Sequence, residues 1–424
     1  MSCPKIISPV NKLKKIHYAW IMVLISACLM MVQALRVFTF GVFLKPITLE
    51  FGWGRGELST AYAICMFTSG SFAIVAARAS DRYGPRILVT ASGLLVATGF
   101  FLMSRISTIW QLQVIWGLLM GLGGSFFFIP ITLIIPRWFV KSRGTAVGLA
   151  GAGFGFGGII APPLAQLLIS AYDWRRACVI LSVITLAIVI PLAQLLKQSP
   201  ERFGIRPYGE EPEFRSGMRQ VGSLAGEGLS LASAVRTRYF WLFGFLQFCF
   251  FCCLQVVLVH VNPYAVDIGI PALTAASVVS TISAFSTVGR IAAGFLSDKV
   301  GWRSMLVVCL STVTVALIWL LVARQVWMFF LFAMVFGLAY GGMVPLTAIV
   351  PTELFGLRAF GAIYAGLTLV STIGESLGAP VAGFIFDITG RYWPAFLICI
   401  FLCSLATTLG ILLMIFSKKQ VYRR

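Results

Sequence analysis

Twelve long runs of apolar residues constrain the fold of this chain more than any other feature of its sequence. Each run is closed by charges, proline or glycine, and each is long enough for a helix that crosses a bilayer, which takes about 20 residues at about 1.5 Å of rise. The runs cover residues 18–44, 58–79, 85–104, 108–135, 144–171, 174–196, 239–262, 271–297, 303–323, 326–350, 359–386 and 393–416. The pattern predicts an all-α membrane protein with 12 transmembrane helices.

The composition excludes a soluble globular protein, because 59% of the 424 residues are hydrophobic and only 11% are charged. The net charge of +19 lies in short connectors between the apolar runs and not on a solvated face, so we expect no nucleic-acid partner. The ten cysteines lie mostly inside apolar runs and show no zinc-ligand spacing. We therefore interpret them as packing residues and expect neither a metal nor a cofactor.

The distribution of Lys and Arg predicts the topology. If the N-terminus is cytoplasmic, 24 of the 33 cations fall in inner segments and seven in outer connectors, while Arg36 and Arg290 lie within the apolar runs. The first apolar run is too long for a signal peptide and lacks a small-residue cleavage site, although Lys12, Lys14 and Lys15 precede it. By the positive-inside rule we expect a multi-pass protein of the cell (inner) membrane with both termini in the cytoplasm.

The chain divides into two similar halves. The long polar segment 197–238 predicts a cytoplasmic linker between an N-terminal six-helix bundle, residues 1–196, and a C-terminal one, residues 239–424. The pattern of Ala77–Arg86 returns 217 residues later as Gly294–Arg303, and shorter echoes occur at a similar offset. The recurrence predicts a duplicated six-helix unit with pseudo-symmetry.

The repeated G-x-x-x-D-[RK]-x-G-x-[RK] turn resembles the signature loop of the major facilitator superfamily, and the resemblance covers the whole chain. Within that superfamily, the segments Phe40–Pro46, Glu50–Ser59 and Val259–Gly269 resemble the monocarboxylate transporters and their oxalate:formate exchanger relatives. The fourth run lacks the arginine that proton-driven drug antiporters of the superfamily usually carry there. Ala77 stands where the first signature glycine is usual, which predicts a looser contact in the N-terminal half.

Arg290, inside the eighth run, is the first candidate for substrate binding. Ser283, Thr287 and Arg290 recur at helical spacing on the single polar face of this run. A guanidinium in hydrocarbon is costly and normally faces a cavity or a partner, and its planar fork of donors matches a carboxylate. The resemblance implies the same role, since a family arginine at the matching place binds the substrate carboxylate. The alternative is a structural arginine paired to Glu375 or to backbone carbonyls.

Other residues complete the expected site. Tyr340, Phe336 and Tyr364 are candidates for substrate contact, with core packing as the alternative for the aromatic rings. Arg36 is either a second cation of the cavity or a side chain that reaches the outer interface. The absence of Lys and Arg from the eleventh run favours a monocarboxylate over a dicarboxylate.

Two residues are candidates for proton coupling. Glu375 is a carboxyl inside the eleventh run, and the alternative role is a permanent ion pair with Arg290 or Arg36. His260, at the outer end of the seventh run, is a candidate relay, with ordinary hydrogen bonding as the alternative.

The signature loops carry charges that we expect to act as a gate between the halves, with a plain topological anchor as the alternative. These gating candidates are Asp81, Arg82, Arg86, Asp298, Lys299 and Arg303. The glycines of the fifth run imitate a dinucleotide-binding motif, but no strand precedes them, so we interpret them as a site of close helix packing.

These observations predict a secondary transporter that moves a small organic anion, a monocarboxylate such as lactate, by alternating access with proton symport. The alternatives are an anion exchanger of the oxalate:formate type, a drug or metabolite efflux carrier, and a non-transporting membrane sensor on the same scaffold. No cluster of catalytic residues is present, so we do not expect an enzyme. We expect a monomer surrounded by membrane lipid.

Overall fold

The structure is a computed structural model that describes residues 17–140, 142–198, 200, 207–209, 228–356 and 358–421, without the side chains of residues 143, 294, 295, 298 and 417–421. The N-terminal half contains the helices α1 (Tyr18–Phe38), α2 (Phe40–Phe51), α3 (Arg55–Ser71), α4 (Ala73–Tyr83), α5 (Pro85–Met103), α6 (Ile109–Leu112), the π-helical η1 (Gln113–Leu119), α7 (Met120–Trp138), α8 (Arg143–Ala171) and α9 (Trp174–Leu195). The C-terminal half contains α11 (Leu231–Val235), α12 (Arg238–Asp267), α13 (Ala272–Val300), α14 (Trp302–Val322), α15 (Val326–Phe355), α16 (Phe360–Thr389) and α17 (Trp393–Val421).

The described residues confirm the predicted membrane architecture. They contain 11 helical stretches that are long and apolar enough to cross a membrane, and α3 and α4, which meet at an angle of 51°, together make a twelfth. Most helices begin and end within a few residues of the predicted runs. The first stretch continues through α2 to Phe51, where Gly52 adopts a left-handed conformation with φ 70° that ends the helix.

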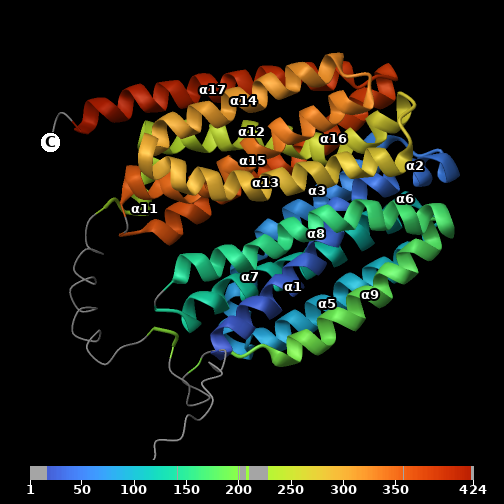
Figure 1. Ribbon diagram of the computed structural model, residues 1–424, viewed down its shortest axis with the longest axis horizontal. Coiled ribbons are helices and arrows are strands. Elements are labelled where there is room, and N and C mark those ends of the chain that lie inside the picture. Colours follow the sequence, from blue (N-terminus) through green and yellow to red (C-terminus); the bar gives the residue numbers. More distant parts are fainter. Residues whose placement is uncertain are drawn as a thin grey trace, which may run out of the picture.

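Two helical bundles lie side by side along the long axis of the molecule (Figure 1). One contains α1 to α9 and the other α12 to α17. We call the end at which α1 begins and α17 ends the proximal end, and the opposite end, where α2 and α12 end, the distal end. Across the two bundles, α3 packs against α16, α8 against α13 and α2 against α12.

Glycines in α8 explain how the bundles approach each other. A Cβ atom on Gly155 or Gly158 would collide with the side chains of Thr287 or Ser283 of α13, so only glycine permits this contact. Nearer the proximal end of α8, a Cβ on Gly148 would meet nothing within 4 Å. The close packing that the sequence predicted for this helix is therefore present, and it is confined to the part away from the proximal end.

Most of the predicted linker, including Glu210, Glu211 and Glu213, lies outside the described residues, as do the lysines that precede α1. The described part of the linker is attached to both bundles. The backbone N–H of Tyr208 donates to the carbonyl of Trp138 at 2.8 Å, and the N–H of Leu229 donates to the carbonyl of Phe355 at 2.8 Å.

Candidate functional site

Arg290 lies partly buried in α13, where α15 holds a hydroxyl beside it. Its Nη2 donates to the hydroxyl of Tyr340 at 3.4 Å, and its Nε is buried without a hydrogen-bond partner. A Cβ on Gly337 would meet the Ile282 carbonyl oxygen at 2.6 Å, so glycine in α15 permits this close crossing. Arg290 thus retains hydrogen-bonding capacity beside a second polar group.

No ion pair neutralises Arg290 within the described part of the chain, and none involves Glu375. The alternative that Glu375 is a permanent partner of Arg290 or Arg36 is therefore wrong for this conformation. Glu375 lies in α16, away from both guanidinium groups by more than an ion-pair distance. Its carboxyl is partly buried, and no described cation pairs with it.

Arg36 is enclosed by its own bundle. Its side chain is only 3% exposed, its Nη1 donates to the Cys65 sulfur at 2.6 Å, and its Nε has no partner. The guanidinium also lies directly against Gly124 of α7. This burial contradicts the interpretation that Arg36 reaches the outer interface. Because sulfur is a weak acceptor, the charge of Arg36 is poorly compensated.

Tyr62 of α3 bonds to the other bundle and lies near charged groups of both bundles. It is fully buried, and its hydroxyl donates to Oε1 of Gln255 in α12 at 3.1 Å. It also lies within electrostatic reach of Arg36, Glu375 and Tyr340. The structure therefore gathers Arg36, Tyr62, Arg290, Tyr340 and Glu375 into one region at the junction of the bundles, which we call the central cluster.

The central cluster contains two guanidinium groups, one carboxyl and two phenols, with no internal ion pair among the described residues. Uncompensated charge in a low-dielectric interior is unfavourable. A carboxylate would accept charge-assisted hydrogen bonds from such guanidinium groups and balance their charge. The arrangement is thus chemically suited to bind an organic anion.

The other predicted substrate residues lie around this cluster in different settings. The hydroxyls of Ser283 and Thr287 donate to carbonyls of their own helix, and both side chains face the glycines of α8. Phe336 is fully buried and packs on Phe332 with ring centroids 5.2 Å apart. Tyr364 stacks on Phe360, three helical turns from Glu375 towards the proximal end. Their roles in binding remain predictions.

A network of charged groups joins the bundles at the distal end. Arg55 of α3 donates to both carboxylate oxygens of Asp267, at 2.6 and 3.0 Å, and to the hydroxyl of Tyr392 at 2.7 Å. Lys45 lies 3.2 Å from the same carboxylate of Asp267. Burial raises the pKa of the Tyr392 phenol, so that it keeps its proton.

The first turn of α3 is capped by a side chain from the other bundle. The carboxylate of Asp387 in α16 accepts hydrogen bonds from the backbone N–H groups of Arg55 and Gly56, at 2.8 and 2.7 Å. These N–H groups have no partner within α3, and a capping side chain typically stabilises a helix by about 0.5–2 kcal/mol. We call Arg55, Gly56, Asp267, Asp387 and Tyr392 the distal lock.

His260 lies directly behind the distal lock and is completely buried. Because the Tyr392 oxygen accepts from Arg55, its proton is free to be donated to Nδ1 of His260, 3.0 Å away, while Nε2 of His260 donates to the carbonyl of Ala379 at 2.8 Å. This assignment gives a neutral imidazole. The sequence placed His260 at an interface, whereas the structure places it inside a cross-bundle network, and its role as a proton relay remains a prediction.

The signature loops make their described contacts within their own bundle. Asp81 pairs with Arg137 at 2.8 Å, Arg86 donates to the carbonyl of Leu196 at 3.2 Å, and the guanidinium of Arg303 lies over the ring of Trp302. Arg82 similarly lies over Tyr83, the side chain of Asp298 is outside the described part, and Lys299 lies at the exposed end of α13. Their gating role remains a prediction.

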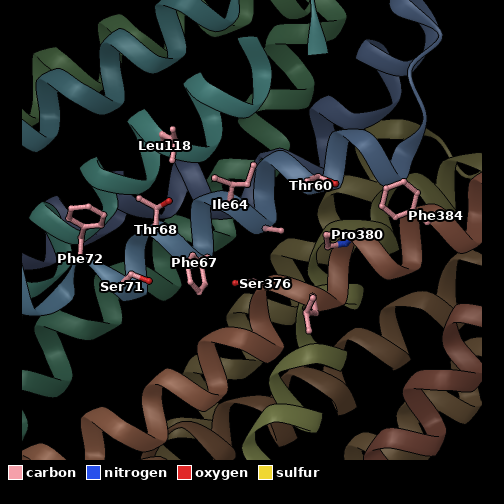
Figure 2. Close-up of a pocket in the computed structure, with 12 residues that line it drawn as sticks. Thr60, Ile64, Phe67, Thr68, Ser71, Phe72, Leu118, Ser376, Pro380 and Phe384 are labelled. Atoms are coloured by element: carbon pink, nitrogen blue, oxygen red, sulfur yellow. The ribbon is translucent and has the colours of Figure 1, made fainter. Parts of the chain in front are cut away.

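A hollow of about 600 Å³ lies between α3, Phe72 at the end of α3, η1 and α16 (Figure 2). Its lining is almost entirely apolar and includes Phe67, Phe72 and Phe384, which are exposed at the surface of the bundles. It contains none of the charged residues of the central cluster. Its lining contains hydroxyl groups but no Lys, Arg or His to balance the charge of an anion, so we place the candidate site at the central cluster and not in this hollow.

Sequence reasoning did not single out Arg55, Asp267, Asp387, Tyr392 or Tyr62. The signal that was available is the presence of opposite charges at the outer ends of the second, seventh and eleventh runs. Pairing them requires knowledge of which helix ends are neighbours, which a single sequence does not supply.

Comparisons with known proteins support the resemblance seen in the sequence. The chain matches the model of the family described as Major Facilitator Superfamily over residues 23–324 and 288–423. Monocarboxylate transporter 13 of Bos taurus is 30% identical over 370 residues, which are 85% of this chain and 81% of that protein. Monocarboxylate transporter 12 of Mus musculus is 24% identical over 404 residues, which are 90% and 82% of the two chains.

Among solved structures, one described as a bacterial homolog to the human lysosomal transporter Spinster, in an inward-facing and occupied conformation, superposes with a TM-score of 0.69. It shares 16% sequence identity and covers 94% of each chain. At this identity the likeness shows the fold alone.

Proposed function

The chain belongs to the major facilitator superfamily, whose members are membrane transporters and not enzymes, and we propose that it moves a small monocarboxylate such as lactate together with a proton. The family and the named relatives support transport of a small organic solute. The identity of the solute, the coupling to protons and the residues that carry them are proposals that rest on the central cluster.

The observation that carries the proposal is the uncompensated guanidinium of Arg290 beside the hydroxyl of Tyr340. Arg290 has a buried Nε without a partner and no ion pair within the described residues. The planar fork of an arginine offers two parallel N–H donors to the two oxygens of a carboxylate. We assign Arg290 to the substrate carboxylate and Tyr340 to a second hydrogen bond with the substrate.

Glu375 supplies the proposed coupling. A carboxyl that lies within a helical bundle and has no paired cation is more stable when it is neutral. Binding of a substrate anion beside Arg36 and Arg290 adds negative charge to the region that also holds Glu375. A proton taken up by Glu375 would offset this charge, so substrate and proton would cross together.

Closure at the distal end supports alternating access. The distal lock joins the bundles, whereas a Cβ on Gly144 or Gly148 of α8, or on Gly361 of α16, would meet nothing within 4 Å near the proximal end. We propose that the central cluster communicates with the proximal side in this conformation. The positive charge of the proximal connectors predicts that this side is the cytoplasm.

The experiment that tests the function is uptake of labelled lactate into proteoliposomes, with and without an inward proton gradient. In low dielectric two charge-assisted hydrogen bonds contribute about 3 kcal/mol, so Arg290→Ala should lower uptake about 100-fold. Arg290→Lys keeps the charge without the fork and should recover only part of this loss. Arg105→Ala, which removes an exposed arginine of a distal connector, is the control and should leave uptake unchanged.

Glu375→Gln should bind and exchange lactate but no longer accumulate it in response to the gradient. The proposal is overturned if the folded natural protein takes up no lactate under either condition. Proton symport alone is overturned if Glu375→Gln still accumulates lactate with the same dependence on the gradient.

A second candidate function is exchange of one anion for another, and the burial of Arg36 favours it. Two poorly compensated guanidinium groups at the junction of the bundles would hold a compound with two acidic groups better than Arg290 alone. Proteoliposomes loaded with unlabelled oxalate test this directly. Uptake of labelled oxalate that requires internal oxalate and ignores the proton gradient would indicate an exchanger.

A further inference from the structure

The distal lock has an unusual division of donors and acceptors. The principal donors belong to the first turn of α3 in the N-terminal bundle, and their carboxylate acceptors, Asp267 and Asp387, belong to the C-terminal bundle. When the bundles separate at this end, the donors lose both carboxylates at once. The backbone N–H groups of Arg55 and Gly56 then have no intrahelical partner to return to.

The donors left behind have the geometry of a carboxylate site. Two adjacent N–H groups already hold the two oxygens of one carboxylate, with Oδ1 of Asp387 2.8 Å from the Arg55 nitrogen and Oδ2 2.7 Å from the Gly56 nitrogen. The guanidinium of Arg55 holds a second carboxylate in a fork. The positive end of the α3 dipole adds to the attraction for an anion.

The side chain of Arg55 is a second indication of a carboxylate site, and it is independent of the helix end. The residue is only 6% exposed, yet its Nε has no hydrogen-bond partner among the described residues. Its guanidinium lies 3.9 Å above the ring of Phe386, which fixes its orientation. A buried and oriented guanidinium with an unused donor is equipped to hold more than the Asp267 carboxylate.

Close packing at the first turn depends on glycine. A Cβ on Gly54 would lie 2.5 Å from the Asp387 carboxylate, and one on Gly56 would overlap the ring of Phe384. No side chain therefore screens the N–H groups from a carboxylate. Asp387 is itself exposed to solvent, so an anion from the distal solution can compete with it.

We propose that the first turn of α3, together with the Arg55 guanidinium, is a carboxylate-binding entry site. It is filled by Asp387 and Asp267 while the distal end is closed, and by the carboxylate of an incoming substrate when the bundles separate. The inference rests on the proposed function only in taking the substrate to be a carboxylate. A ligand that replaces these two acids favours the distal-open state, because it binds that state alone.

Two variants separate an entry site from a simple lock. Asp387→Asn weakens the lock and removes the carboxylate that competes for the site, because the amide has one acceptor oxygen and no charge. Arg55→Gln weakens the lock and destroys the site. Distal opening is measured in cells with a membrane-impermeant maleimide at Ser59→Cys, a position that is buried in α3 beside His260, after subtraction of labelling without that substitution. If the maleimide labels the protein only in inverted membrane vesicles, both the labelling and the uptake of lactate are measured in inverted vesicles.

Labelling should rise in both variants, and the half-saturating concentration of labelled lactate should change in opposite directions. We expect it to fall about threefold in Asp387→Asn and to rise about tenfold or more in Arg55→Gln. A shift in the same direction in both variants would show that the network is only a lock. Unchanged labelling in both variants would show that the network does not hold the distal end closed.

A failure of the proposed function gives a different result. If the natural protein takes up no lactate, acetate still tests the site, with chloride as the control anion. Acetate should increase labelling of Ser59→Cys in the natural background and in Asp387→Asn but not in Arg55→Gln, whereas chloride should increase it in none. Equal effects of acetate on all three backgrounds, or no effect on any, would overturn the entry site.

Discussion

The distal and proximal ends of the two bundles both carry charged residues but use them differently. At the distal end, Arg55 of one bundle is held by Asp267 and Asp387 of the other. At the proximal end, Asp81 pairs with Arg137 of its own bundle. The side chain of Asp81 is 62% exposed, whereas that of Arg55 is 8% exposed. Charges stabilise a junction between bundles where they are buried across it, and they contribute little where solvent reaches them.

The packing of the glycines in α8 also differs between the distal part and the proximal part of the molecule. In α8 the glycines that face α13 fit against its side chains, while the glycine at position 148 meets open space. One helix therefore has a closed part and an open part, and the change occurs along a stretch of uniform composition. Small residues therefore permit the close approach of two helices but do not enforce it.

The largest effect should come from filling the contact between α8 and α13. A Cβ on Gly158 would lie 2.5 Å from Oγ of Ser283, so Gly158→Val should destabilise the distal-closed arrangement by about 1–3 kcal/mol through overpacking. Maleimide labelling of Ser59→Cys should rise accordingly. The matched control is Gly148→Val on the same helix, which should leave labelling unchanged; equal responses of the two variants would remove the distinction between the ends.

A smaller effect is expected from Tyr392→Phe in the distal lock. The change removes the hydroxyl that accepts from Arg55 and donates to His260, while the aromatic ring and its packing remain. Loss of these hydrogen bonds should weaken distal closure by about 1–2 kcal/mol. Labelling of Ser59→Cys measures the shift, and Tyr83→Phe, an exposed tyrosine of the proximal end, serves as the control. No difference between them would show that the network of His260 does not contribute to closure.

The smallest effect is expected at the proximal end from Asp81→Asn. The pair with Arg137 is 38% and 62% exposed on its two sides and lies within one bundle, so its loss should change the free energy of unfolding by less than about 1 kcal/mol. Thermal unfolding in detergent measures this, with Asp267→Asn as the comparison at the distal end. A larger destabilisation from Asp81→Asn than from Asp267→Asn would reverse the contrast between the two ends.

Much of the fold followed from the sequence for a simple reason. A helix that spans a bilayer must be apolar along about 20 residues whatever its neighbours are, so each span leaves a local signal. The boundaries were less well defined, because α2 and the distal end of α12 continue past the apolar core to Phe51 and Asp267. Helix ends outside hydrocarbon are set by caps and partners, which are not visible as hydrophobicity.

The candidate site followed from the sequence only in part. Arg36, Arg290 and Glu375 stood out because ionisable groups are rare inside apolar runs. Tyr62 did not stand out, since one tyrosine among many aromatic residues has no distinguishing pattern. Its place in the cluster depends on Gln255, which is 193 residues away in the sequence.

Hydrophobicity and charge along the chain were enough to predict the class of the protein, its helical spans and the residues whose charge has to be compensated within the membrane. Those properties depend on hydrophobicity and charge along a local stretch, and the contributions of neighbouring residues to both simply add. Packing in three dimensions decided that Arg36 is enclosed and that Glu375 is unpaired within the described residues. It also decided that the carboxylate of Asp387 caps a helix of the other bundle. These facts depend on which helices become neighbours, and that choice is made by packing between residues hundreds of positions apart.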